Sequence, residues 1–192
     1  MKNRKIFVAS EPPAEPSTPL VNKAIRLSEA GQFEDALRLL ATGTSAAPEI
    51  RNARGVCLLR LGRAEDAVRT FRALVVPSGC TWMNKELPVH YRTNFSTALL
   101  LAGLPLGAKE TLHEIPEKYH PSVLRLQAAL ASWVRGLSWW QRLNWKMGLA
   151  PDVPVRLDFL PGEFADPLST GVATPSAGVA ASTSVSTTNQ VA

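Results

Sequence analysis

The stretch of residues 52–74 constrains the fold of this chain most, because small and apolar residues recur in it at fixed spacings. The pattern is Gly55-x2-Leu58-x3-Gly62-x4-Ala67-x3-Phe71. A glycine at position 55 lets a neighbouring helix approach closely, and Gly62 permits the positive φ of a tight turn between two helices. Ala67 is small where the second helix crosses the first. The stretch predicts a helical hairpin, and further hairpins should flank it because a single one cannot bury its own apolar face.

The same pattern occurs twice more in the chain. The copy 31 residues earlier contains Ala24, Leu27, Gly31, Ala36 and Leu40, and the copy 41 residues later contains Ser96, Leu99, Gly103, Ala108 and Leu112. The three copies predict helix pairs at 20–30 with 33–42, 49–61 with 64–75, and 88–102 with 105–115. Pro48 and Pro121 stand near the end of the first and third copies.

Over about residues 18–121 the chain resembles the tetratricopeptide-repeat superfamily. The resemblance implies an all-α array of three helical hairpins, in which the first helix of each pair lines a concave groove. Members of this superfamily share a scaffold and not a chemistry, so the resemblance carries little information on the particular function.

A fourth, divergent helix pair is expected after Pro121. Its first helix ends at Gly136, and Ser138 is a suitable N-cap for the second. Trp139, Trp140, Leu143 and Met147 fall within an arc of about 100° on that second helix. We expect this arc to cap the array by packing near Leu112 and Ile115. Beyond it, Val153, Val155, Leu157, Phe159 and Leu160 suggest an extended segment packed back on the array.

Composition divides the chain into four parts. Residues 1–19 form a Pro-rich leader that we expect to be disordered. Residues 20–121 hold the three tetratricopeptide-like repeats, and residues 122–164 hold the Trp-rich basic capping helices and the extended segment. Residues 165–192 form a tail dominated by Ser, Thr, Ala and Val, which contains too little large apolar surface to fold and should be disordered.

The groove implied by the resemblance is our main candidate for a functional site. The register of the first helices places a stripe of nine residues on it: Val21, Ile25, Ser28, Asn52, Val56, Leu59, Thr93, Thr97 and Leu100. Relatives that hold a chaperone's terminal carboxylate use a Lys/Asn/Arg clamp at such positions, and this stripe has one Asn and neither Lys nor Arg. We therefore expect an adaptor or scaffold that binds an unidentified protein or peptide, without a chaperone-type carboxylate clamp. Some of these side chains could instead only contact neighbouring helices.

The Trp-rich basic helix at 138–149 supports an alternative function. Tryptophan together with Lys and Arg is typical of helices that lie at a membrane surface. The residues available for contact with a membrane or a partner are Trp139, Trp140, Arg142, Trp145 and Lys146. The same surface could serve self-association. The loop at 77–88, which holds Trp82 and Met83, could either cover apolar surface or form a partner-binding tip.

Other classes of function lack a sequence signal. The three histidines and two cysteines show no metal-ligand spacing, and no nucleophile elbow or phosphate-binding glycine loop is present. We expect no enzyme activity, no metal and no cofactor. A net charge of +5 is too small to indicate nucleic acid. Two unpaired thiols and the absence of a secretory apolar run indicate a cytoplasmic location.

Overall fold

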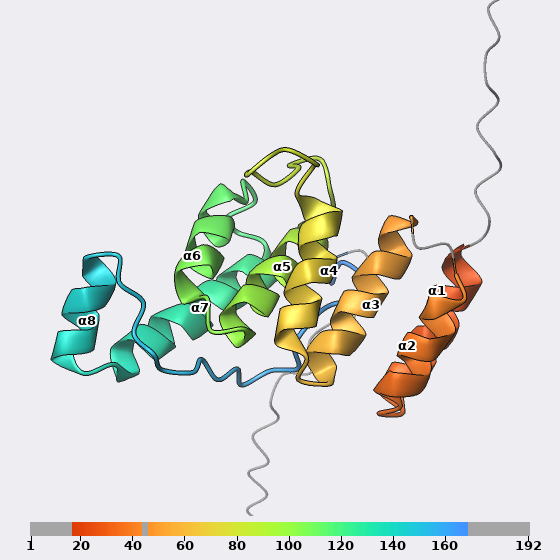
Figure 1. The fold of residues 1–192 in the computed structure, drawn as a ribbon, viewed down its shortest axis with the longest axis horizontal. Coiled ribbons are helices and arrows are strands. Elements are labelled where there is room, and N and C mark those ends of the chain that lie inside the picture. Colours follow the sequence, from red (N-terminus) through yellow and green to blue (C-terminus); the bar gives the residue numbers. More distant parts are fainter. Residues whose placement is uncertain (1–16, 44–45, 169–192) are drawn as a thin grey trace, which may run out of the picture.

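The computed structural model describes residues 17–43 and 46–168, and these residues form helices joined by turns, with no β-strand among them (Figure 1). The helices are α1 (Ser17–Glu29), α2 (Phe33–Ala41), α3 (Pro48–Arg60), α4 (Ala64–Val75), α5 (Val89–Leu101), α6 (Pro105–Glu114), α7 (Pro121–Gly136) and α8 (Trp139–Lys146). The all-α prediction is confirmed for this part of the chain. The predicted disorder of the leader and tail concerns mostly residues 1–16 and 169–192, which lie outside the described residues.

The first six helices pack as three hairpins, α1 with α2, α3 with α4 and α5 with α6. Each hairpin packs on the next, and α7 packs against α5 and α6. Each of the first three hairpins turns at the predicted glycine: Gly31, Gly62 and Gly103 have φ of 76°, 74° and 74°. In the middle turn the Gly62 N–H donates to the Leu59 carbonyl at 3.0 Å, and the Arg63 N–H donates to the Leu58 carbonyl at 2.9 Å. These bonds satisfy carbonyls that the end of α3 would otherwise leave unpaired.

The close approach predicted at Gly55 is also present. A Cβ atom at this position would lie 2.4–2.7 Å from ring carbons of Phe71, so only glycine leaves room for the ring. The small residues at the helix crossings, Ala36, Ala67 and Ala108, are fully buried. The recurring sequence pattern is therefore a packing pattern of α2, α4 and α6 against their partners.

The core consists of two apolar clusters. The smaller one joins α1, α2 and α3, and the larger one runs from α3 to α7. Phe164, from the chain beyond α8, packs against both clusters. A residue more than a hundred positions from α3 thus contributes to the junction between the first two hairpins.

The orientation predicted for α8 is wrong. Trp139, Trp140 and Met147 are 64%, 61% and 65% exposed, and Leu143 is also exposed. Trp145, on the other side of the helix, is the buried one. Its ring meets Trp133 of α7 edge to face at 5.3 Å between centroids, and Lys109 of α6 lies 5.4 Å from its centroid. A helical wheel shows which residues share a face but not which face meets the array, and here that face is the one with Trp145.

Boundaries differ slightly from the predicted ones. Residues 17–19, assigned to the leader, form the first turn of α1, where a proline is tolerated because its missing N–H would have no helical partner. Residues 165 and 166, assigned to the tail, belong to the end of the extended segment, and residues 167 and 168 form a turn after it.

The two large apolar residues of the loop at 77–88 lie in different environments, one buried and one exposed. Met83 is buried in the larger cluster, and its N–H donates to the Glu114 carboxylate at 3.2 Å. Trp82 is 60% exposed. The loop therefore covers apolar surface through Met83 and presents one tryptophan to solvent.

Candidate functional site

An extended segment of residues 153–166, called the strap from here on, returns from α8 across α7, α5 and α3 (Figure 1, blue). Its odd-numbered residues from Val153 to Phe159 face the helices, whereas Arg156, Asp158 and Leu160 are exposed. This alternation is the period of two that an extended chain produces. The predicted extended segment is confirmed, with the exception that Leu160 points away from the array.

The strap is held by its main chain. Asn94 of α5 donates from Nδ2 to the Glu163 carbonyl at 2.7 Å and accepts from the Glu163 N–H at 2.8 Å. Asn52 of α3 donates to the carbonyls of Glu163 and Phe164 at 3.1 and 3.3 Å. Asn94 also donates to Asn52 Oδ1 at 2.8 Å, which fixes both amides. Two buried asparagines thus supply the hydrogen bonds that an extended peptide lacks when no strand lies beside it.

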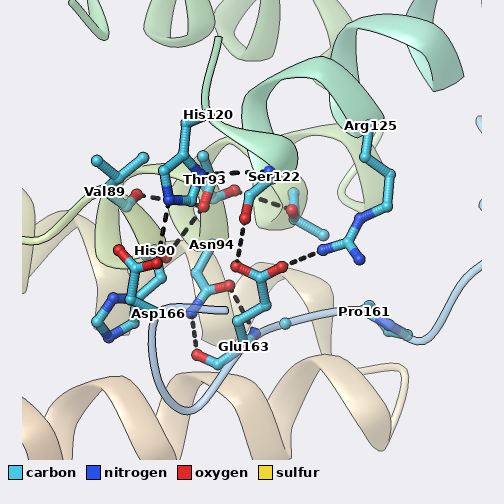
Figure 2. Close-up of polar contacts among 12 residues, drawn as sticks. Val89, His90, Thr93, Asn94, His120, Ser122, Arg125, Pro161, Glu163 and Asp166 are labelled. Carbon is cyan, nitrogen blue, oxygen red and sulfur yellow. Dashed lines mark hydrogen bonds and ion pairs between the residues drawn. The ribbon is translucent and has the colours of Figure 1, made fainter. Parts of the chain in front are cut away.

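The Glu163 side chain provides a second set of contacts (Figure 2). Ser122 Oγ donates to one carboxylate oxygen at 2.7 Å, and the Arg125 guanidinium forms an ion pair with the other. Both partners come from α7. Glu163 is 15% exposed at its side chain, so this carboxylate is largely removed from water and its charge is compensated.

The positions on either side of Glu163 restrict which side chains fit there. Gly162 has φ of 81°, and a Cβ there would lie 3.1 Å from both γ-carbons of Val56 and 3.3 Å from Leu59 Cδ1. Phe164 lies under the Arg60 guanidinium at 4.7 Å. Arg60 also donates to the carbonyls of Pro161 and Gly162 at 3.4 and 3.2 Å. This part of the site accepts glycine followed, two residues later, by an aromatic ring.

The strap ends at a buried histidine. His120 Nε2 lies 3.1 Å from Asp166 Oδ1. Burial acts to raise the pKa of Asp166, but hydrogen bonds from the Leu168 N–H and from His120 outweigh it and hold this pKa below its ordinary value. Burial lowers the pKa of His90 to about 4, although the negative charge of Asp166 acts to raise it. The Nδ1 atom of His90 has no hydrogen-bond partner.

The structure brings together part of the predicted groove stripe. Asn52, Val56 and Leu59 contact the strap, and Ser28 accepts a hydrogen bond from Arg60 at 2.8 Å. The remaining members serve other roles. Val21 and Ile25 belong to the smaller cluster and Leu100 is fully buried in the larger one. The hydroxyls of Thr93 and Thr97 bond to carbonyls of their own helix.

Sequence reasoning missed five residues that hold the strap: Arg60, Asn94, His120, Ser122 and Arg125. Asn94 could have been suspected, because asparagine is a poor residue inside a helix unless its amide has a specific use. We call these five residues together with Asn52, Val56 and Leu59 the anchor site.

The second candidate surface lies on α8, remote from the anchor site in Figure 1. Trp139 and Trp140 stack on each other with centroids 4.0 Å apart and both face solvent. Lys146 is exposed on the same helix, whereas Arg142 donates to the carbonyls of Leu137 and Arg135 at 2.9 Å. Of the five residues predicted for membrane or partner contact, Trp145 is the one that the structure buries.

Metal binding has no candidate site in residues 17–43 and 46–168. No group of three or more metal-binding side chains occurs in them. Cys57 is buried and burial raises its pKa to about 11, which keeps the thiol protonated and unreactive. None of the helices in this part of the chain has the length and apolar character needed to cross a membrane.

Comparison of the chain with models of known protein families, with curated proteins and with solved structures gave no match. The class that the fold defines is an all-α array of helical hairpins with a strap bound along it. The tetratricopeptide relationship stays a prediction from the sequence pattern.

Proposed function

We propose that this chain is a protein-interaction module, an adaptor or scaffold that binds an extended peptide across α3, α5 and α7. One observation carries the proposal: the anchor site recognises main-chain groups. Asn94 pairs with both the N–H and the carbonyl of one residue, and Asn52 donates to two successive carbonyls. Contacts of this kind hold any extended peptide, and side-chain pockets beside them provide selectivity.

The receptor side of this site is preformed. Asn52, Asn94 and Ser122 lie on helices that pack on one another, and the hydrogen bond from Asn94 to Asn52 orients both amides independently of the strap. Binding therefore requires little ordering of the receptor, which favours useful affinity from a small number of contacts. The cytoplasmic location and the absence of enzyme activity remain predictions from the sequence.

The test uses a variant in which the strap is released from the anchor site. Gly162→Val and Glu163→Lys together place a branched side chain where a Cβ already crowds Val56 and a cation opposite Arg125. A random peptide library displayed on phage is selected on this released variant. Peptides should be enriched that lose binding when Asn94→Asp is added. Enrichment of no peptide, or of peptides indifferent to Asn94→Asp, contradicts the proposal.

A second candidate function is attachment to an anionic membrane surface through α8. The observation that favours it is the exposed tryptophan pair Trp139 and Trp140, beside the basic residues of a stretch, 121–150, that contains no acid. Tryptophan prefers the headgroup region, and Lys or Arg near the surface adds about 1 kcal/mol each toward anionic lipid.

Flotation with vesicles separates this candidate from the adaptor. Vesicles that contain phosphatidylserine should carry the protein upward, and vesicles of pure phosphatidylcholine should carry less of it. Trp139→Ser with Trp140→Ser should abolish flotation, whereas Trp82→Ser, which removes an equally exposed tryptophan from the loop, should not. Protein that stays at the bottom with both vesicles excludes the membrane candidate.

A further inference from the structure

We infer that the strap is an intramolecular copy of the ligand, so that the partner is a peptide with the order glycine, acid, aromatic, any residue, acid. The inference rests on the proposed function and specifies both the chemistry of its ligand and the competitor that occupies the site. In the strap this order is Gly162, Glu163, Phe164, Ala165 and Asp166.

Each position of the order has its own physical reason. Glycine is required because φ is 81° and a Cβ would crowd Val56 and Leu59. The first acid lies between Ser122 and Arg125, and the second lies against His120. Ala165 is exposed, so its side chain is free to vary.

The aromatic position has two contacts that an aliphatic residue would not reproduce. Phe164 bridges both apolar clusters, and its ring lies under the Arg60 guanidinium at 4.7 Å. A planar ring gains from the cation an attraction that a leucine lacks. The polar groups of the site are complementary to the strap as well: Arg125 forms an ion pair with Glu163, and the His120 ring lies against Asp166.

The strap is more readily displaced than a core element. The hydrogen bonds of residues 161–164 are to side chains of the array, and none of the described residues forms a strand beside them that would add a ladder of main-chain bonds. Asp158 and Leu160, just before these residues, are exposed. A tethered segment of this length acts at an effective concentration of roughly millimolar, so an untethered peptide with equal contacts competes at a disadvantage.

The decisive experiment uses a fluorescein-labelled peptide of the chain's own residues 155–168, VRLDFLPGEFADPL, and measures its anisotropy with four full-length proteins. The wild-type protein should bind it at least tenfold more weakly than the released variant, in which Gly162→Val and Glu163→Lys free the site. Adding Asn94→Asp to the released variant should reduce binding to the level of a scrambled peptide. Asp158→Lys, the same charge reversal at an exposed position of the strap, should behave as wild type.

Peptide positions are tested on the released variant. Replacing the glycine by valine, the first acid by lysine, or the aromatic residue by leucine should each weaken binding at least fivefold, and replacing the alanine by serine should not. If peptides from the phage selection bind through Asn94 but lack this order, the adaptor function stands and the assigned ligand chemistry is wrong. Equal binding of the 155–168 peptide to the wild type and to the released variant would show that the strap does not compete with the peptide for the anchor site, and the inference would then be wrong.

A measurement on the wild-type chain covers the case in which the released variant fails to fold. The Glu163 amide is bonded to Asn94, so its hydrogen exchange reports strap occupancy. Millimolar unlabelled 155–168 peptide should accelerate exchange of this amide at least threefold and leave amides of α3 unchanged. Unchanged exchange overturns the inference. A dimer that forms with rising concentration and disappears in the released variant would show instead that the strap occupies a second copy.

Discussion

At the scale of single residues, Gly55 tests the packing of the middle hairpin. Gly55→Ala places a methyl group 2.4–2.7 Å from the Phe71 ring, and overpacking of this kind typically costs about 1–3 kcal/mol. Gly136→Ala is the matched control, because a Cβ there meets nothing within 4 Å. It should leave stability unchanged or raise it by up to about 1 kcal/mol through helix propensity. Urea unfolding of both variants measures the difference, and equal midpoints would mean that α3 and α4 do not approach closely at Gly55.

Asn94 is the residue on which the strap depends most. Asn94→Ala removes both hydrogen bonds to the Glu163 main chain and leaves that carbonyl with Asn52 alone. Loss of paired groups at a buried site costs about 1–3 kcal/mol. Asn144→Ala, at an exposed position of α8, should cost less than about 0.5 kcal/mol. Urea unfolding gives both values, and hydrogen exchange at Glu163 should accelerate only in the first variant.

The sequence was informative about residues whose role is local. Gly31, Gly62 and Gly103 are required by a turn that a few neighbouring residues form, so their spacing alone predicted them. Asn94 and Arg125 act on Glu163, which lies 69 and 38 residues away. A single sequence contains no signal for such a distant pairing. The predicted stripe therefore identified Asn52 but placed Thr93, one residue before Asn94, at the site.

At the scale of elements, α8 also shows that local features could be predicted from the sequence and distant contacts could not. Its N-cap at Ser138 was predictable because the capping box lies within four residues. Its orientation was not, because the contacts of Trp145 with α6 and α7 depend on the path of the chain through buried Leu137. The extended strap was predicted from its apolar residues, but its register along α3, α5 and α7 follows from hydrogen bonds that only the fold creates.

The two sides of α8 should respond differently to truncation. Trp145→Ala removes a buried indole that contacts Trp133 and should cost about 3–5 kcal/mol. Trp140→Ala removes an indole that is 61% exposed and should cost less than about 0.5 kcal/mol. Denaturant unfolding followed by circular dichroism measures both. A large loss from Trp140→Ala would restore the cap that the helical wheel predicted and would remove the basis for a membrane-binding face.

At the scale of the whole molecule, stability should fall in mild acid because of His90. Burial lowers the pKa of His90 to about 4 from an ordinary 6.5, and the nearby His120 and Asp166 act on it in opposite directions. Between these pH values the unfolded chain binds more protons than the folded one, so the free energy of unfolding rises with pH across this window. The effect of His90 on the free energy of unfolding should be absent above about pH 7, and this free energy should be lower by about 2 kcal/mol at pH 5.

The carboxylates act in a separate, more acidic window. A hydrogen bond from Arg92 lowers the pKa of Glu117, and that of Asp166 is also lowered, so their stabilisation is present at higher pH and is lost as the pH falls through the folded values. Urea unfolding between pH 8 and 5 therefore isolates the histidine. His90→Gln should flatten the profile across this range, and His113→Gln, at an exposed position, should leave its slope unchanged. An identical slope in wild type and His90→Gln would show that His90 is not held neutral in the folded chain.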